Sequence, residues 1–480
     1  MYVAPYAVSV RKDELTNEDF EAMRELGGAN AGICYLDSDS HVIEPVPQDT
    51  LLEGVIDNDY FASQKAIGEK ALTRFRKCIE DKHHSVADHV WVELRLSGIS
   101  KMLAMWLNLL RFSNTSEKSG RYTHMISVDD ETEEAYDKWE QHCLDYIDRQ
   151  YPNMPQFKKA GVAKENARYM LGVFDRITTM GYSTSWRCWN YIIYWADHCW
   201  EWVYSGGYTE DTLPPFYAQF CEELEELRDE LLVLGLQVDG LIDEKYPFPN
   251  VLHYPVKGVA MPFGAIQDEY AMTDMGWAPR MQGLNAFAVA NGTCTFAARM
   301  SYAGAAQLLR HRRLHVQLYP CLDGLGISVC NDDVQLPPDK DDTLYMHRQE
   351  YFVRPAGFVE DTADWRKWVS DLSRLTEDDN PRIGATVWVK VSGSLADILA
   401  VVTERSCGSA QVEIRQLAQQ LVQRMIKLNA EDKGLDYADR ILLHNFQQKI
   451  KSNAVRPYTR CMVNKCKKPC MWIKDAGYTL

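Results

Sequence analysis

The sequence predicts a mixed α+β fold built from two consecutive, similar domains. Segments with the spacing of amphipathic helices alternate with short runs rich in β-branched and aromatic residues, a pattern typical of proteins that pack helices against sheets. Fragments of one motif also occur in both halves of the 480-residue chain, at an offset of about 200 residues. That offset is far longer than a solenoid repeat and favours a duplicated domain. We therefore predict one domain at residues 1–245 and a second at residues 246–480.

The first half contains one clear strand pattern and several helix patterns. Val90, Trp91 and Val92 open a stretch in which apolar and charged residues then alternate, so residues 90–96 are predicted to form a strand. A stripe of tryptophans within residues 184–204, including Trp186, is predicted to lie in the core or an interface. Apolar residues at near-helical spacing predict helices over residues 57–81, 100–112, 129–151, 158–172, 184–204 and 210–235.

The second half repeats this order of elements. Pro247 and Pro249 interrupt any regular element within residues 244–250, which places the domain boundary there. Beyond it, strands are predicted over residues 293–300 and 384–391. Helices are predicted over residues 303–312, 394–405 and 409–428.

Composition restricts the class of protein. The formal net charge of −16 argues against a surface that binds nucleic acid, although a local basic pocket could still hold an anionic nucleotide. We see no signal peptide and no run of about 20 apolar residues, so we expect a soluble cytoplasmic protein without a membrane span. The 13 cysteines show no disulfide framework, and the irregular spacing of Cys461, Cys466 and Cys470 does not predict a metal site.

The strongest motif is divided between the halves. Residues 111–122 read Arg-Phe-Ser-Asn-Thr-Ser-Glu-Lys-Ser-Gly-Arg-Tyr, and residues 307–312 read Gln-Leu-Leu-Arg-His-Arg. With Arg111 placed on Arg312, the fragments complete one pattern: Arg-His-Arg, seven residues, then the first residue of Ser-Gly-Arg-Tyr. That pattern resembles the motif of the flavin-dependent thymidylate synthases.

Three further segments resemble the same family. Residues 83–89 are similar to its His-x-Ser-x-x-Glu-His element, with Asp88 in place of Glu, and residues 165–168 are similar to its Glu-x-Ala-Arg helix. Residues 405–415 resemble its Arg-x4-Ala-Gln-x-Glu-Ile-Arg helix. Each half also lacks what the other keeps, because Leu109-Leu110-Arg111 replaces Arg-His-Arg and Pro320 falls where the loop Ser should be.

The resemblance implies a division of labour between the halves. In the family the Ser-Gly-Arg-Tyr loop holds a uracil nucleotide. Its Arg suits the phosphate dianion, which needs bidentate cationic donors, and its Gly lets backbone amides come close to the base. The second half would then hold the flavin. The implied catalytic residues are Ser119 and Arg111; the implied substrate-binding residues are Glu117, Ser119, Gly120, Arg121, Tyr122, Arg168, Arg187 and Gln307; the implied cofactor-binding residues are His83, Ser85, His89, Arg310, His311 and Arg312.

The resemblance also implies a reaction and an assembly. Each domain is expected to be an antiparallel sheet packed with helices. The implied reaction is the reductive methylation of dUMP to dTMP, with FAD as cofactor and NADPH and methylenetetrahydrofolate as co-substrates. Family members are homotetramers, so a tandem fusion is expected to form a homodimer that acts as a pseudo-tetramer, with composite sites shared between repeats.

Two alternatives stay open at this point. Ser116 and Asp88 depart from the family pattern, which allows flavin-dependent C5-alkylation or hydroxymethylation of another pyrimidine nucleotide. The protein could also bind nucleotide without catalysing a reaction. At the level of residues, Arg310 to Arg312 could be a solvated helix end, and the helix bearing Glu413 could be largely structural.

Overall fold

The computed structural model describes most of the chain. The described residues are 14–35, 58–110, 112–125, 129–205, 209–242, 283–290, 292–320, 352–353, 362–377, 379–405, 410–431 and 435–452. The predicted boundary at residues 244–250 and the Cys461–Cys470 tail lie outside these ranges. Within them, each helix is too short or too polar to cross a membrane.

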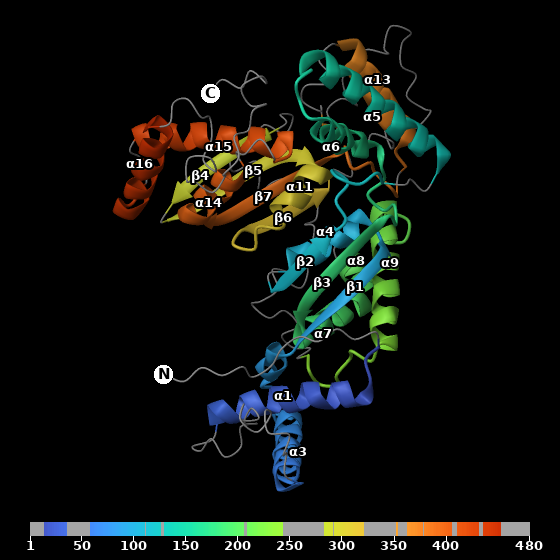
Figure 1. The fold of residues 1–480 in the computed structure, drawn as a ribbon, viewed down its shortest axis with the longest axis vertical. Coiled ribbons are helices and arrows are strands. Elements are labelled where there is room, and N and C mark those ends of the chain that lie inside the picture. The colour runs from blue at the N-terminus through green and yellow to red at the C-terminus, as the bar shows by residue number, and fades with distance from the viewer. Residues whose placement is uncertain are drawn as a thin grey trace.

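The first half is built on a three-stranded antiparallel sheet in the order β1-β3-β2. Its strands are β1 (Trp91–Ile99), β2 (Ser113–Glu117) and β3 (Thr178–Ser185). Helices α4 and α7 contact this sheet, and α9, which runs alongside it in Figure 1, contacts both of these helices. The helical elements of this half are α1 (Asn17–Tyr35), α3 (Asn58–Glu80), η2 (His84–His89), α4 (Lys101–Leu109), α5 (Asp130–Gln150), α6 (Gln156–Ala167), η3 (Arg168–Met170), α7 (Trp186–Asp197), α8 (Cys199–Ser205) and α9 (Pro215–Val233).

The second half is built on a four-stranded antiparallel sheet in the order β4-β5-β7-β6. Its strands are β4 (Gly283–Ala290), β5 (Thr293–Ser301), β6 (His315–Pro320) and β7 (Thr386–Ser394). Helices α11, α14 and α15 contact this sheet and one another on one face. The helices are α11 (Tyr302–Leu308), α13 (Thr362–Leu375), α14 (Leu395–Arg405), α15 (Val412–Glu431) and α16 (Tyr437–Ser452).

The two sheets share their topology, and the β2–β3 pair of the first has the same register as the β6–β7 pair of the second. Leaving out β4 and the helices between the second and third strands, both follow the order strand, helix, strand, strand, helix, and both place the third strand between the other two. The helix caps Ser100 and Ser185 of the first half align with Ser301 and Ser394 of the second. In that alignment the strand pair Asn114–Ser183 falls on the pair His315–Ser392.

The strand-to-helix junctions of the two halves carry the same buried clamp. Ser100 caps α4, and its backbone N and its Oγ donate to the two carboxylate oxygens of Glu223 on α9. Ser301 caps α11 and donates in the same way to Glu413 on α15, at 2.5 and 2.6 Å. A serine cap satisfies an otherwise unpaired helix N–H and contributes about 1 kcal/mol. Burial raises the pKa of both carboxyls, and the serine hydrogen bonds partly oppose that rise.

Helix packing and backbone hydrogen bonds both join the two halves. Helix α13 of the second half packs beside α5 of the first, where Trp139 and Trp368 meet edge to face and Asp371 accepts hydrogen bonds from Lys138 and Trp139 (Figure 1). Backbone hydrogen bonds also join residues 169–173 to residues 381–384. Helix α5 and residues 169–173 therefore join the first half to the second.

Most predicted elements are present, and the differences have local causes. The α+β class is confirmed, and Trp186, Trp189 and Trp195 are buried as predicted. Residues 184 and 185 belong to β3 rather than to the predicted helix, because Ser185 caps α7. The helix predicted over residues 303–312 ends at Leu308, so the Arg-His-Arg run lies in the turn that follows α11.

Candidate functional site

The predicted nucleotide loop and the Arg-His-Arg turn meet where the two halves face each other. The loop follows β2, which ends at Glu117, and the turn follows α11. Arg168 lies in η3, after α6, and Gln411 immediately precedes α15. Five cationic side chains lie here close to two carboxylates. The cations are Lys101, Arg121, Arg168, Arg310 and Arg312, and the carboxylates are Glu117 and Glu165. The site is thus locally positive in a chain whose net charge is −16.

Glu117 lies at the centre of this arrangement. Its side chain is 2% exposed and forms ion pairs with Lys101 through Oε1 and with Arg310 through Oε2, the latter at 2.6 Å. Burial alone would raise the pKa of Glu117, but Lys101 and Arg310 outweigh that effect and lower it. The carboxylate therefore stays ionised and joins the two halves.

The Ser119–Tyr122 segment forms a tight turn over Arg168. The Ser119 carbonyl accepts hydrogen bonds from the backbone N of Tyr122 and Thr123. A Cβ at Gly120 would lie 3.3 Å from Arg168 Cδ, so glycine allows the turn to approach that side chain. Arg121 Nε pairs with Glu165 Oε2 at 2.6 Å, and Tyr122 is exposed. The turn thus presents Arg121 beside Arg168.

Arg168 and Gln307 converge on Gln411. Arg168 Nη2 and Gln307 Nε2 both donate to Gln411 Oε1, at 2.8 and 2.7 Å. Burial lowers the pKa of Arg168. The side-chain oxygen of Gln307, Oε1, is buried and accepts no hydrogen bond. A buried acceptor without a donor costs about 1–3 kcal/mol, so this atom is suited to receive a ligand N–H.

Arg312 fastens the turn to the first half. Its Nε donates to Ser113 O at 3.2 Å, and Nη1 donates to Asn108 O at 2.6 Å and to Leu309 O at 3.0 Å. Nη2 donates to Asn108 Oδ1 and Thr115 Oγ1. All five N–H groups of the guanidinium therefore have protein partners.

The side chain of His311 is 10% exposed, and its ring is neutral. Arg405 Nε donates to His311 Nε2 at 2.7 Å, which requires that ring nitrogen to be an acceptor. Burial, followed by the charges of Arg405 and Arg312, lowers the pKa of His311 to about 3.

We expect His311→Gln to change the pH dependence of stability. The folded-state pKa lies below the ordinary value of 6.5. The stabilisation that the neutral ring contributes to the folded state is therefore complete above pH 6.5 and is lost as the pH falls. That loss amounts to about 2 kcal/mol between pH 7 and pH 5 in the native protein. Urea unfolding should therefore show that the free energy of unfolding of the native protein, relative to that of the variant, is smaller at pH 5 than at pH 7. An equal difference at both pH values would contradict a neutral ring.

The remaining predicted residues lie at another part of the first half. His83, Ser85 and His89 are exposed on or beside η2, whose main neighbours are α1, α3 and α7. Arg187 pairs with Asp88 at 2.9 Å in this region. The structure therefore does not bring these residues together with Glu117 and Arg310 within one chain. Arg111 lies outside the described residues.

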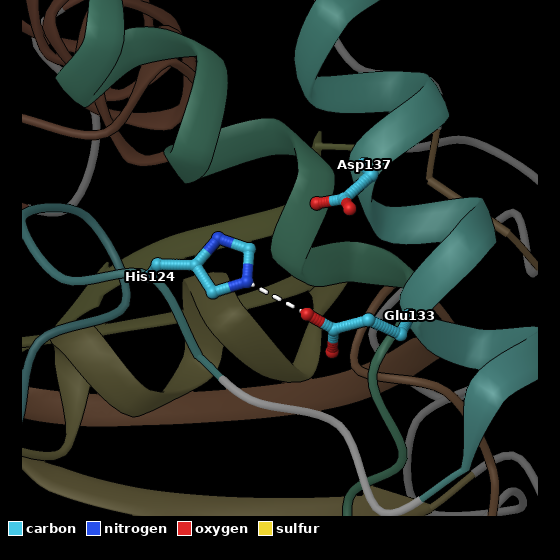
Figure 2. Close-up of side chains that lie close together, drawn as sticks. All are labelled: His124, Glu133 and Asp137. Carbon is cyan, nitrogen blue, oxygen red and sulfur yellow. Dashed lines mark hydrogen bonds and ion pairs between the residues drawn. The ribbon is translucent and has the colours of Figure 1, made fainter.

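A second polar cluster lies beside the nucleotide loop, where His124 faces the acidic side of α5 (Figure 2). His124 Nε2 lies 2.8 Å from Glu133 Oε1, and candidate ligand atoms of His124, Glu133 and Asp137 lie within 4.8 Å of one another. The hydrogen bond with Glu133 raises the pKa of His124, which favours the protonated ring. The geometry is that of an ion pair that fastens the end of the loop to α5.

Four contributing residues were missed by the sequence-based site prediction. Gln411 and Arg405 belong to the Arg-x4-Ala-Gln motif, so the motif could have indicated them had its helix been assigned to the site. Glu165 begins the Glu-x-Ala-Arg motif and pairs with Arg121. Lys101 carries no motif signal, and its role depends on the fold bringing α4 beside the end of β2.

Comparison with known proteins agrees with the first-half motifs. Residues 33–185 match the profile of the family described as thymidylate synthase complementing protein. No curated protein and no solved structure matches the chain. The matched segment contains the His83–His89 element, the Ser119–Tyr122 turn and Arg168. The match over residues 33–185 supports the resemblance of this part of the chain to the flavin-dependent thymidylate synthases.

Proposed function

We propose that the protein converts dUMP to dTMP by reductive methylation, using FAD, NADPH and methylenetetrahydrofolate, at a site shared between two tandem repeats. The observation that carries this proposal is the positive cluster between the halves, which joins the Ser-Gly-Arg-Tyr turn to the Gln-x-x-Arg-His-Arg segment. The matched topology and the paired Ser–Glu clamps support an origin by duplication.

The described residues fit an anionic pyrimidine nucleotide. Arg121, in the turn, lies beside Arg168, and both could pair with a phosphate dianion. The unpaired Oε1 of Gln307 could accept a hydrogen bond from a ring N–H such as N3–H of uracil. Fixed positive charge near the ring would stabilise negative charge that develops on the pyrimidine during C5 attack.

The fit to a flavin is partial within one chain. Arg310 keeps 39% of its side chain exposed and could pair with a flavin phosphate. His83, Ser85 and His89 are exposed on another part of the first half, so we propose that a second copy of the chain supplies them in a homodimer. Bound FAD would supply the redox chemistry, while the chain orients both ligands and excludes water.

We further propose one working site per chain. The position in the first half that corresponds to the Gln307–Gln411 pair of the second half is filled with apolar groups. Superposing the clamps places Trp106 on Gln307 and Cys221 on Gln411. Trp106 is buried against Trp195 and Phe220, and Cys221 is fully buried. The polar pair that lines the proposed site thus has no counterpart there.

A second candidate is a protein that binds the nucleotide without flavin chemistry. One observation favours it: of the three predicted flavin-binding residues in the Arg-His-Arg run, Arg312 donates all its N–H groups to protein acceptors and His311 is held by Arg405. Only Arg310 retains substantial exposure.

Flavin stoichiometry tests these proposals. We expect about one FAD per chain in the visible spectrum of the reconstituted protein, with the spectrum perturbed when dUMP is added. Two per chain would contradict the filled second site. A protein that binds dUMP but no FAD would leave only the second candidate.

A further inference from the structure

Lys101 is a charged residue in an unusual place. It is the first residue of α4, a helix otherwise buried from Met102 to Leu109. Its side chain is only 15% exposed and pairs with Glu117, and burial lowers its pKa while Glu117 opposes that shift. Burying an ammonium group is costly, and it is sustained only by a close partner such as this carboxylate.

Glu117 has two counter-ions of different character. Lys101 is nearly buried and belongs to the same half, whereas Arg310 comes from the other half and is 39% exposed. Arg168 is the other cation whose charge interacts with both Glu117 and Lys101. Of the two ion-pair partners, the exposed guanidinium of Arg310 is the one that an anionic ligand can reach.

We propose that Lys101 is a positioning residue for the proposed nucleotide and flavin site, keeping Glu117 ionised and the loop in place when Arg310 turns from Glu117 to an anionic ligand. Without Lys101, that exchange would leave the Glu117 carboxylate buried with no direct counter-ion. A buried carboxylate in that state takes up a proton, because desolvation disfavours its charged form. With Lys101 present, ligand binding needs no proton at Glu117. The inference rests on the proposed function, since the ligand is its anionic nucleotide or cofactor.

Proton linkage tests this role directly. Calorimetric titration of the full-length chain with FAD, in the presence and absence of dUMP, is performed in buffers of different ionisation enthalpy. The slope of the measured enthalpy against that ionisation enthalpy gives the protons taken up per FAD. Subtracting the native value cancels protons exchanged by the phosphate itself. We expect Lys101→Met to take up about one more proton than the native protein near neutral pH, with affinity falling about tenfold per pH unit as the pH rises.

Two variants separate this role from simple stability. Lys101→Arg retains the cation and should restore the native proton count. The double variant Lys101→Met/Glu117→Gln removes both charges, so it folds without an unpaired buried ion and should show no extra uptake. Equal proton uptake by Lys101→Met and the native protein, with FAD bound by both, would overturn the inference alone. If the native protein binds neither dUMP nor FAD, the proposed function fails and takes the inference with it.

Discussion

Replacing Arg312 by alanine is expected to destabilise the protein by about 3–5 kcal/mol, the largest stability effect of any substitution at the site. Four of the five N–H groups of Arg312 donate to the first half, to the backbone carbonyls of Asn108 and Ser113 and to the side chains of Asn108 and Thr115. Alanine would remove all four of these hydrogen bonds between the halves. Urea unfolding followed by tryptophan fluorescence measures the loss, since the first half is rich in buried tryptophan.

Arg313 provides the matched control. Its side chain is 75% exposed and lies 3.8 Å from Asp397, so Arg313→Ala should change stability by no more than about 0.5 kcal/mol. Arg312→Lys should be intermediate, because an ammonium has three donors rather than five. If Arg312→Ala unfolds like Arg313→Ala, the guanidinium does not fasten the halves together.

Arg121→Ala is expected to have the largest effect on ligand binding, weakening dUMP by about 100-fold or more while FAD remains bound. Its guanidinium is 20% exposed and is held by Glu165, so it is oriented before a phosphate arrives. Isothermal titration with dUMP measures the loss, and the flavin spectrum measures retained FAD.

Lys118→Ala is the control for Arg121→Ala. Lys118 belongs to the same loop and is exposed, so its loss should change dUMP affinity only slightly. Loss of FAD in Arg121→Ala would contradict the proposed division of labour between the halves. Equal effects of the two substitutions would show that the loop acts through general charge rather than through a placed guanidinium.

The sequence predicted the fold where apolar periodicity is strong. Helix α5 and strand β5 agree closely with their predicted ranges. Strand β3 was missed because Thr178–Ser185 contains Gly181 and several hydroxyl residues, and so lacks an apolar alternation. Its burial comes from its place between two other strands, which only the assembled sheet provides.

The candidate site was predicted only where motif residues mark it, because the remaining contacts depend on the assembled fold. The motif fragments identified Glu117 and Arg310 in separate halves, and the structure pairs them. The saturation of Arg312 could not be inferred, because its acceptors are backbone carbonyls that any sequence could present. Nor could sequence reveal that His83 and Arg187 would lie apart from this pair, since that depends on how the strands and helices are ordered in space.

The tryptophan that stands in place of Gln307 has an evolutionary consequence. Trp106 packs against Trp195 and Phe220, so returning it to glutamine would open a cavity and bury an amide before any polar partner existed. Several coordinated changes would be needed, and each alone would be harmful. If the halves arose by duplication, the loss of the second site is difficult to reverse, because the two copies can no longer return to being self-sufficient subunits. Neither half, expressed alone, is then expected to be active.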